Sequence, residues 1–343
     1  MGDVILTSPV FSFLKQIYPA SNLYFLTYKK YTDFFKDDPR LTFVTGITSL
    51  SDHDELNNLK KNNFDLIVDL QNNRKSNMIR LRYFNDIKTG KLNKLRLKRI
   101  VLLLLRLNFY DIRDNIVRRY IKATGSPIAI TTELPPVSLT FQSAFTGNPD
   151  VQRCILCNSP SCTHNDMLPE SFSKLKPIIA LMPFSTWRNK KWPGLSYVKI
   201  GQYFQKKKWN IILFGGPEEE KESEEIQNKI GESCYNLTGK ISLYHAGQIL
   251  KQCRLALGND TGLSHLARAC QVPTGIIYGS TTSHFGFFPY GKPPYKILQS
   301  NQLCRPCHPH GGNICYRITR PCLSNVSVPF VISELENLLK ISL

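Results

Sequence analysis

Hydrophobic and polar residues alternate along most of the chain in a way that is typical of alternating strands and helices. Short runs rich in β-branched and aromatic residues predict strands, and apolar residues at helical spacing predict helices. The expected strands are residues 22–28, 64–70, 178–182, 210–214, 234–237, 254–257 and 274–278. The expected helices are residues 4–18, 75–83, 94–106, 111–123, 193–206, 217–230, 242–251, 261–270 and 328–343.

This alternation is interrupted between residues 145 and 176, where three prolines occur among polar and cysteine-rich sequence. The chain has 343 residues, which is more than one hydrophobic core usually supports. We therefore predict an α/β protein with two Rossmann-like, doubly wound domains that face a central cleft. The expected divisions are a domain at 1–150, a Cys-rich linker or insertion at 151–176, a domain at 177–326 and a C-terminal helix at 327–343.

The charge is unusual for a chain of otherwise ordinary globular composition. With 44 Lys+Arg against 26 Asp+Glu the net charge is +18, and fifteen of the basic residues lie between Asn73 and Lys122 with only three acids. Apolar residues are interleaved with them at helical spacing, so we expect amphipathic helix here. A solvated basic face, a site for an anionic or membrane-associated substrate, and a nucleic-acid surface are the three interpretations. Nucleic acid is the weakest, because no recognised binding motif accompanies the charge.

No segment has the length of a membrane span. The longest apolar run, Ile100 to Leu105, has six residues, whereas a spanning helix needs about 20. The first residues also lack the basic and apolar regions of a secretory signal. Ten cysteines without such a signal favour reduced thiols or metal ligands over a disulfide framework. We expect a cytoplasmic protein.

Polar residues follow several of the expected strands. After the strand that ends near Gly258, Asp260 or Thr261 is expected to cap a helix whose free backbone amides form an anion site. Gly262 allows close approach of a phosphate, and His265 lies one turn further on. The alternative interpretation is an ordinary capped helix with a core histidine.

Two further loops are expected at the same edge of the sheet. In the loop 183–193, the hydroxyls of Ser185 and Thr186 and the ammonium of Lys190 suit a diphosphate. In the loop 215–219, Glu219 offers a carboxylate to ribose or sugar hydroxyls. Because the carboxyl ends of parallel strands meet at one edge, the three loops together predict a nucleotide-diphosphate pocket.

These residues form a pattern that resembles glycosyltransferase family 9, the ADP-heptose:lipopolysaccharide heptosyltransferases. The resemblance covers nearly the whole chain. It is carried by Gly2-Asp3 with Pro9, Asp69-Leu70-Gln71, Lys190-x-Trp192-Pro193, Gly215-Gly216-Pro217-x-Glu219, Asp260-Thr261-Gly262-x-x-His265-x-Ala267 and Pro289-Tyr290-Gly291.

The resemblance implies a GT-B fold, an ADP-heptose donor in the C-terminal domain and an acidic glycolipid acceptor in the N-terminal one. It also implies inversion without a required cofactor or metal, at the cytoplasmic face of the inner membrane. We further expect a monomer, and no nucleic-acid partner because no binding motif accompanies the charge. Asp3 would be the general base, and Lys190 would stabilise the leaving diphosphate. The expected donor-binding residues are Ser185, Thr186, Lys190, Glu219, Asp260, Thr261, Gly262 and His265, and the expected acceptor-binding residues are Gln71, Arg74 and Lys75.

Two features depart from the family pattern. Family members usually have a strand before the Gly-Asp motif, and here Gly2-Asp3 directly follows Met1. We therefore expect the first strand to be missing from this sequence and the true start to lie upstream.

The other departure concerns the cysteines. Cys304, Cys307, Cys315 and Cys322 match a pattern seen in many members, whereas Cys154, Cys157 and Cys162 with His164 do not. Either set could hold a structural zinc, or both could be reduced thiols in short loops.

Two alternatives to a heptosyltransferase stay open from the sequence. One is a GT-B transferase that uses another nucleotide sugar, and the other is an inactive basic protein that binds glycolipid.

Overall fold

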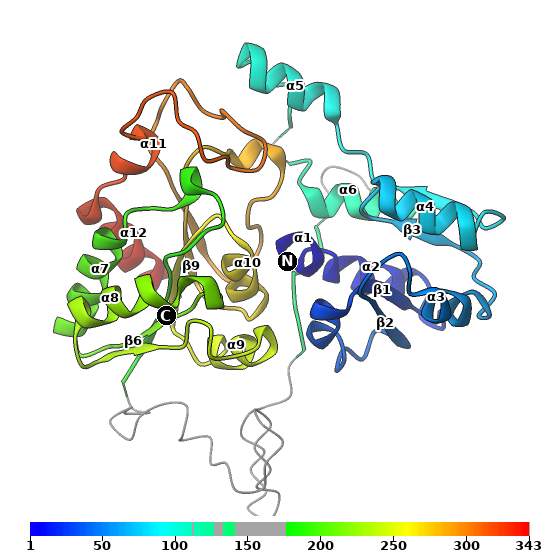
Figure 1. Ribbon diagram of the computed structural model, residues 1–343, viewed down its shortest axis with the longest axis horizontal. Coiled ribbons are helices and arrows are strands. Elements are labelled where there is room, and N and C mark those ends of the chain that lie inside the picture. The colour runs from blue at the N-terminus through cyan, green and yellow to red at the C-terminus, as the bar shows by residue number, and fades with distance from the viewer. Residues whose placement is uncertain (112, 127–132, 141–175, 343) are drawn as a thin grey trace, which may run out of the picture. The chain divides into compact units, whose positions relative to one another are not determined.

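The computed structural model describes residues 1–111, 113–126, 133–140 and 176–342, which form two compact units (Figure 1). Unit 1 comprises Met1–Thr140 together with Ser283–Tyr290, and unit 2 comprises Phe141–Thr282 and Gly291–Leu343. The Cys154–His164 set and most of the expected linker lie outside the described residues.

Unit 2 is built on one parallel sheet in the order β10-β9-β8-β5-β6-β7. Its strands are β5 (Ile178–Met182), β6 (Asn210–Leu213), β7 (Cys234–Asn236), β8 (Leu255–Asn259), β9 (Thr274–Ile277) and β10 (Tyr295–Leu298). From β5 the chain first builds outward through β6 and β7, and then returns to the other side of β5 with β8. Such a reversal of strand order is a topological switch point, and ligands of open α/β sheets bind at the carboxyl ends of the two strands beside it.

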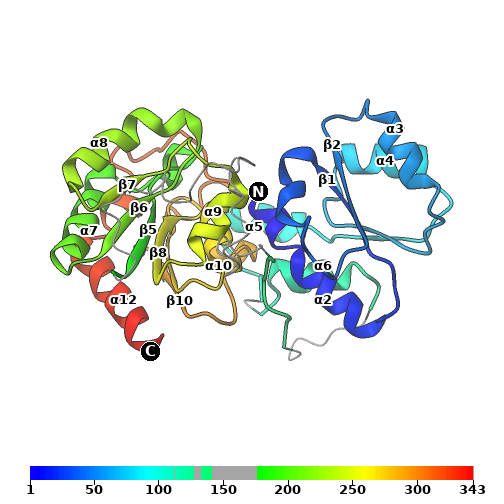
Figure 2. The ribbon, with the colours of Figure 1, turned by 90° about the horizontal axis from the view of Figure 1, so that it is seen from below.

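Helices cover both faces of this sheet, as Figure 2 shows for α7 and α12 on one side and α9 and α10 on the other. The helices are α7 (Gly194–Lys206), α8 (Glu220–Ile230), α9 (Leu243–Leu250), α10 (Gly262–Ala269), α11 (Pro321–Ser324) and α12 (Val328–Ile341). Because both faces are covered, the central strands are apolar throughout, and β5 reads Ile-Ile-Ala-Leu-Met with every residue buried. The core cluster joins β5, β6 and β8 to Trp192, Tyr197 and Leu335.

Unit 1 holds two separate parallel strand pairs, and within its described residues the structure pairs no strand of one with the other. One pair is β1 (Tyr24–Tyr28) with β2 (Phe43–Ile47), and the second is β3 (Ile67–Asp69) with β4 (Thr89–Lys91). The helices are α1 (Gly2–Ile5), α2 (Ser8–Ile17), α3 (His53–Lys60), α4 (Arg74–Tyr83), α5 (Arg96–Leu105) and α6 (Ile116–Lys122).

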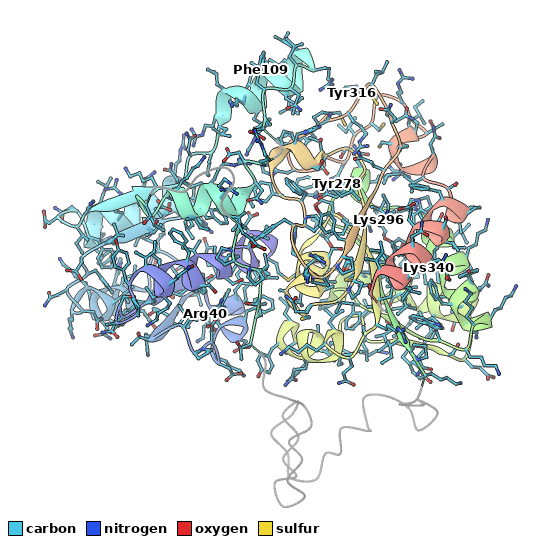
Figure 3. The ribbon with its side chains drawn as sticks, turned by 180° about the vertical axis from the view of Figure 1, so that it is seen from behind. Arg40, Phe109, Tyr278, Lys296, Tyr316 and Lys340 are labelled. Carbon is cyan, nitrogen blue, oxygen red and sulfur yellow. The ribbon has the colours of Figure 1, made fainter. Side chains whose placement is uncertain are left out.

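The two strand pairs of unit 1 nevertheless share a hydrophobic core. Residues of β1, β2 and β3 pack with Leu56 and Leu59 of α3 and with Tyr83 and Phe84 at the end of α4. A second cluster joins α1, α2 and α6 through residues such as Leu6, Val10 and Val117. In Figure 3 Arg40 is labelled in this unit, where its guanidinium pairs with Asp38 at 2.5 Å.

The segment Ser283–Tyr290 belongs to unit 1 although it follows β9 of unit 2. Arg119 of α6 donates from Nη2 to the carbonyl of Phe285 at 2.6 Å, and the amide of Ile116 donates to the carbonyl of Gly286 at 3.0 Å. Gly286 has φ +92°, and a Cβ there would lie 2.0 Å from Arg119 Nη2. This position therefore requires glycine.

The expected elements of unit 2 are confirmed, apart from small differences at their ends and the short edge strand β10, which the pattern did not predict. In unit 1 the expected helix over 4–18 is broken at Leu6–Thr7 into α1 and α2. Strands β2 and β4 were also missed, because β4 is three residues long and β2 is interrupted by Gly46. Gly2 and Asp3 lie in helix α1 and not in a loop after a strand.

The packing of α12 on the sheet predicts a large effect of truncating one side chain. Leu335 is fully buried in the unit 2 core, so Leu335→Ala should lower the free energy of unfolding by about 2–5 kcal/mol. The matched control is Leu195→Ala on α7, where the side chain is 61% exposed and the change should stay within about 0.5 kcal/mol. Urea unfolding of both variants measures this, and equal losses would contradict the assigned core.

Candidate functional site

The loops that leave β5 and β8 are joined at the switch point by one buried amide side chain. Asn259, the last residue of β8, accepts from the amide of Trp192 at 3.0 Å through Oδ1. Its Nδ2 donates to the carbonyl of Pro183 at 2.9 Å. Asn259 is fully buried, and both of its polar atoms are used to fix the start and the end of the loop 183–193. This loop is therefore held against β8.

Lys190 and Asp260 form an ion pair at this edge of the sheet. The Nζ of Lys190 lies 2.6 Å from Oδ2 of Asp260, and the two side chains are only 13% and 9% exposed. Thr281, just after β9, donates its hydroxyl to the same oxygen of Asp260 at 2.9 Å. Three loops from three neighbouring strands thus converge on one carboxylate. The positive charge of Lys190 therefore lies at the switch point, and the carboxylate of Asp260 neutralises it.

A close approach between two loops fixes the position of Lys190. The amide of Ser280 donates to the carbonyl of Asn189 at 3.0 Å, which joins the loop after β9 to the loop after β5. A Cβ on Gly279 would lie 2.2 Å from that same carbonyl oxygen of Asn189. Because the contact is with backbone, it cannot be relieved by a side-chain rotation, and Gly279 has no space for another residue.

Helix α10 begins directly beside this ion pair. Thr261 is its N-cap residue, but its side chain makes no capping hydrogen bond. The first-turn amides, including that of Gly262, are therefore not capped by a side chain, and with the helix dipole they favour an anion. His265 is buried one turn further on, with its amide on the carbonyl of Thr261 at 3.3 Å. Lys190 thus pairs with the residue that directly precedes Thr261 and Gly262, and the donor-binding role of all three stays a prediction.

The third predicted loop is built around Glu219. Its carboxylate accepts from the amide of Gly216, so it closes its own turn. Burial is the main cause that raises the pKa of Glu219, against the lowering effect of that hydrogen bond. In the first loop, Ser185 Oγ accepts from the amide of Trp187 at 3.2 Å, and Thr186 is exposed. No contact recorded among the described residues brings Ser185, Thr186 or Glu219 to Lys190, so their donor-binding role stays a prediction.

In unit 1 the predicted acceptor residues lie around the start of α4. Asp69, at the end of β3, accepts from the amides of Gln71 and Asn72 at 2.9 and 2.7 Å and from the hydroxyl of Ser76 at 2.7 Å. This buried carboxylate shapes the turn that carries Gln71 and leads into α4. A capping box of Asn73 and Ser76 completes the start of the helix.

Arg74 and Lys75 are the first two residues of α4 and both are exposed. Lys75 donates to the hydroxyl of Tyr28 at 3.4 Å, which directs its chain toward the end of β1. Two cations at a helix start are disfavoured by the helix dipole, so helix stability does not explain the presence of Arg74 and Lys75. Their placement is compatible with binding of an anionic group.

Asp3 is exposed on α1 of the same unit. Burial is the main cause that lowers the pKa of Lys94, whereas the charges of Asp69 and Asp3 act in the opposite direction. Asp3 also adds to the raised pKa of Tyr120, which burial dominates. Lys94 therefore interacts electrostatically with both Asp3 and Asp69, and the motifs did not single it out.

Thr281 is the functional candidate that sequence reasoning did not select, although it lies in the Gly-Ser-Thr-Thr run after β9. A hydroxyl two residues after a glycine at a strand end is a weak signal by itself. Thr281 is identified by its hydrogen bond to Asp260. This bond could be predicted only if the pairing of β8 with β9 were known.

Cys304, Cys307, Cys315 and Cys322 form no disulfide within the part of the chain that the structure describes. In the described part of the chain, Cys304, Cys307, Cys315 and Cys322 are not part of any group of three or more potential ligands that could hold a metal ion. Burial raises the pKa of Cys322 to about 11, and that thiol is therefore protonated at neutral pH. Among the described residues, no helix combines the length and the hydropathy of a membrane span.

Sequence comparisons place these observations in a family. The model of "Glycosyltransferase family 9 (heptosyltransferase)" matches residues 56–311. Lipooligosaccharide heptosyltransferase 2 of Haemophilus influenzae is 31% identical over 115 residues, which are 32% of this chain and 33% of that protein. The chain thus spans about a third of the length of that curated relative. Lipopolysaccharide heptosyltransferase 1 of Campylobacter coli is 24% identical over 306 residues, 84% of each chain.

Solved structures share the fold. A glycosyl transferase family 9 protein from Veillonella parvula matches with a TM-score of 0.74 at 18% identity, covering 99% of this chain and 94% of that one. ADP-heptose lps heptosyltransferase II of E. coli matches with 0.67 at 18% identity, covering 99% and 96%. E. coli heptosyltransferase WaaC with ADP-2-deoxy-2-fluoro heptose matches with 0.65 at 17% identity, covering 98% and 96%. The α/β fold with parallel sheets is therefore similar to that of GT-B heptosyltransferases.

The close contact at Gly279 gives a test of the site's construction. Gly279→Ala places a methyl group against the Asn189 carbonyl and should lower the free energy of unfolding by about 1–3 kcal/mol. Gly194→Ala is the matched control, because its nearest new contact, Ile226 Cδ1, would lie at an ordinary 3.5 Å. Thermal unfolding of both variants checks this, and a Gly279→Ala protein as stable as the wild type would disprove the close approach.

Proposed function

Because the chain belongs to glycosyltransferase family 9, we propose that it transfers heptose from ADP-heptose to an acidic acceptor of the lipopolysaccharide core or lipid A, with inversion at the anomeric carbon. The observation that carries this proposal is the Lys190–Asp260 ion pair beside the start of α10. Structures of relatives in this family have been solved with ADP and with an ADP-heptose analogue, which supports the same donor here.

The donor diphosphate fits the chemistry of the switch point. Lys190 supplies a point charge that is shielded from water, and the first turn of α10 supplies backbone amides from Thr261 onward. When the diphosphate binds, Lys190 exchanges part of its interaction with Asp260 for the phosphate oxygens. Thr281 keeps Asp260 in place while this happens, since its hydroxyl remains bonded to the carboxylate.

Lys190 and the α10 amides would also stabilise the leaving diphosphate during the transfer. As the bond between the anomeric carbon and the diphosphate oxygen breaks, negative charge grows on the leaving ADP. Lys190 and the α10 amides are already oriented toward that charge, so they stabilise the transition state more than the ground state.

In the proposed reaction Asp3 of unit 1 accepts the proton of the acceptor hydroxyl as this hydroxyl attacks the anomeric carbon. Lys94 interacts electrostatically with both Asp3 and Asp69. Arg74 and Lys75 at the start of α4 and Gln71 before it would bind acidic groups of the acceptor. We propose that the protein acts as a monomer at the cytoplasmic face of the inner membrane, without a cofactor and without a nucleic-acid partner.

The role of Lys190 predicts a loss of nucleotide binding. Lys190→Met should weaken ADP binding at least about tenfold, because a charge-assisted contact is lost and Asp260 is left without its partner. Lys190→Arg keeps the charge and should bind ADP better than Lys190→Met. The control is Lys199→Met, a lysine exposed on α7. Calorimetric titration with ADP measures all three, and unchanged affinity in Lys190→Met would refute a donor site here.

The role of Asp3 predicts a loss of turnover without a loss of donor binding. Asp3→Asn should lower kcat about 100-fold to 10,000-fold, the usual contribution of a general base, and leave ADP affinity unchanged. Asp54→Asn on the exposed side of α3 is the control. Near-normal turnover of Asp3→Asn would assign the base elsewhere.

The same assay separates the proposed function from its two alternatives. Equal turnover with another nucleotide sugar would favour a different GT-B transferase. Binding of anionic glycolipid with neither transfer nor donor hydrolysis would favour an inactive binding protein.

A further inference from the structure

Helix α5 of unit 1 carries an apolar surface that no described part of the chain covers. Leu97 and Leu104 are 75% and 76% exposed, and Ile100 is half exposed. Isolated exposed leucines are common on proteins, but several on one face of one helix mark an interaction surface. Figure 1 shows α5 (cyan) set apart from the strand pairs of unit 1.

The exposed face of α5 is distinct from the face that holds the helix to unit 1. Leu102 is buried and packs with Tyr110 and Phe285, and Leu103 packs against the same cluster. With 3.6 residues per turn each residue advances by about 100°. Leu97 and Leu104 then lie about 100–160° away from Leu102 and Leu103, and Ile100 lies between Leu104 and Leu103. The helix is apolar on two sides, and only one of them is used for folding.

Basic residues border the exposed apolar face on both sides. By the same helical geometry, Arg96 lies at one border and Lys98 at the other, and both are exposed. They stand in the first turn of α5, where no acidic residue occurs and Leu95 provides no side-chain cap. Cations at this end are disfavoured by the helix dipole, so helix stability does not explain them.

The basic residues around the start of α5 repel one another. Burial is the main cause that lowers the pKa of Lys94, and the nearby charges of Arg96 and Arg99 lower it further. Such crowding of cations is unfavourable in the free protein and is relieved when an anionic surface approaches.

The apolar surface continues beyond the end of the helix. Leu105 lies in its last turn, and Leu107 and Phe109 follow it, all three exposed. Figure 3 labels Phe109 beside α5. Tyr110, the next residue, is buried against Phe285, which fixes the segment to unit 1. The exposed side chains are thus carried on a firmly packed base.

We propose that α5 together with Leu107 and Phe109 is the membrane-docking surface of this protein, with the apolar side chains inserted into the interface of a bilayer that contains anionic lipid. An apolar stripe bordered by Lys and Arg is the pattern of helices that lie in the plane of a membrane interface. The inference rests on the proposed function in one respect, since a glycolipid acceptor would be presented at such a surface.

A second copy of the chain is a poorer occupant. A ten-residue helix is only about 15 Å long, whereas a stable dimer interface buries about 1,200–2,000 Å² in total. Helix α5 also contains no acidic residue that could pair with Arg96 and Lys98 of a second copy, so two copies would bring only like charges to this face. A bilayer with anionic headgroups offers the opposite charge around an apolar interior.

Sedimentation with lipid vesicles tests the proposal. The wild-type protein should bind vesicles of phosphatidylglycerol and phosphatidylethanolamine and bind those of phosphatidylcholine at least about tenfold more weakly. Leu97→Ser/Leu104→Ser should lower the partition coefficient on anionic vesicles at least about 30-fold. Arg96→Gln/Lys98→Gln should lower it about tenfold to 30-fold and remove most of the preference for anionic lipid.

The matched control is Leu195→Ser/Phe330→Ser, which removes two exposed apolar side chains from unit 2 and should leave vesicle binding unchanged. A Leu104→Trp variant reports insertion directly, since brominated lipid should quench its added fluorescence and should not quench that of Leu195→Trp. Equal vesicle binding by the wild type and Leu97→Ser/Leu104→Ser would overturn the proposal. So would concentration-dependent dimerisation that this variant abolishes, which would assign the face to a second copy.

A transfer assay keeps this inference apart from the proposed function. With a deacylated, water-soluble acceptor, Leu97→Ser/Leu104→Ser should transfer heptose at the wild-type rate, and with acceptor embedded in vesicles it should be at least about tenfold slower. Transfer to the soluble acceptor without vesicle binding by the wild type would overturn the docking surface and leave the proposed function standing. Vesicle binding without any transfer would do the reverse. A rate on soluble acceptor that falls equally in this variant would show that α5 binds the acceptor headgroup and not the bilayer.

Discussion

The arrangement of the loops at the switch point of unit 2 depends on one carboxylate, that of Asp260. A lysine in a largely water-excluded position needs a counter-charge, because desolvation of an isolated ammonium is unfavourable. Asp260 provides it at 2.6 Å, and Thr281 restrains the same oxygen. The pair can exist only where the loops after β5, β8 and β9 meet, which in turn requires the strand order of unit 2. Asn259 and the glycine at 279 bring the loops to that distance.

Unit 1 is organised differently, around surfaces that carry excess positive charge. The carboxylate oxygens of Asp69 accept hydrogen bonds from the turn before α4 and from Ser76. Arg74 and Lys75, which follow this turn, are exposed. The basic stretch is thus divided between two sites of different character. The start of α4 presents polar and charged groups alone, whereas α5 presents cations beside exposed leucines. An acidic headgroup and the apolar interior next to it are the two components of a glycolipid at a membrane surface.

Much of unit 2 could be predicted from the sequence, because its central strands are buried on both faces and read as short apolar runs between clear helix patterns. The same reasoning placed Lys190, Asp260 and Thr261 at one edge. The Lys190–Asp260 ion pair and the Thr281–Asp260 hydrogen bond could not be predicted, because they depend on which strands are neighbours in the sheet. Thr281 was missed for that reason. In unit 1 the strands are short and half-buried, so their hydrophobic pattern is weak, and the pattern predicts one helix where the structure has α1 and α2. The affiliation of Ser283–Tyr290 with unit 1 has no local signal at all, because it depends on Arg119 and Gly286, which are far apart in sequence.

The central claim is that Lys190 and the start of α10 bind the donor diphosphate in place of part of the Asp260 interaction. A crystal structure of the protein with ADP tests it most directly. We expect phosphate oxygens within hydrogen-bond distance of Lys190 Nζ and of the α10 first-turn amides, and Thr281 still bonded to Asp260. ADP bound away from β5 and β8, with the Lys190–Asp260 pair unchanged, would contradict it.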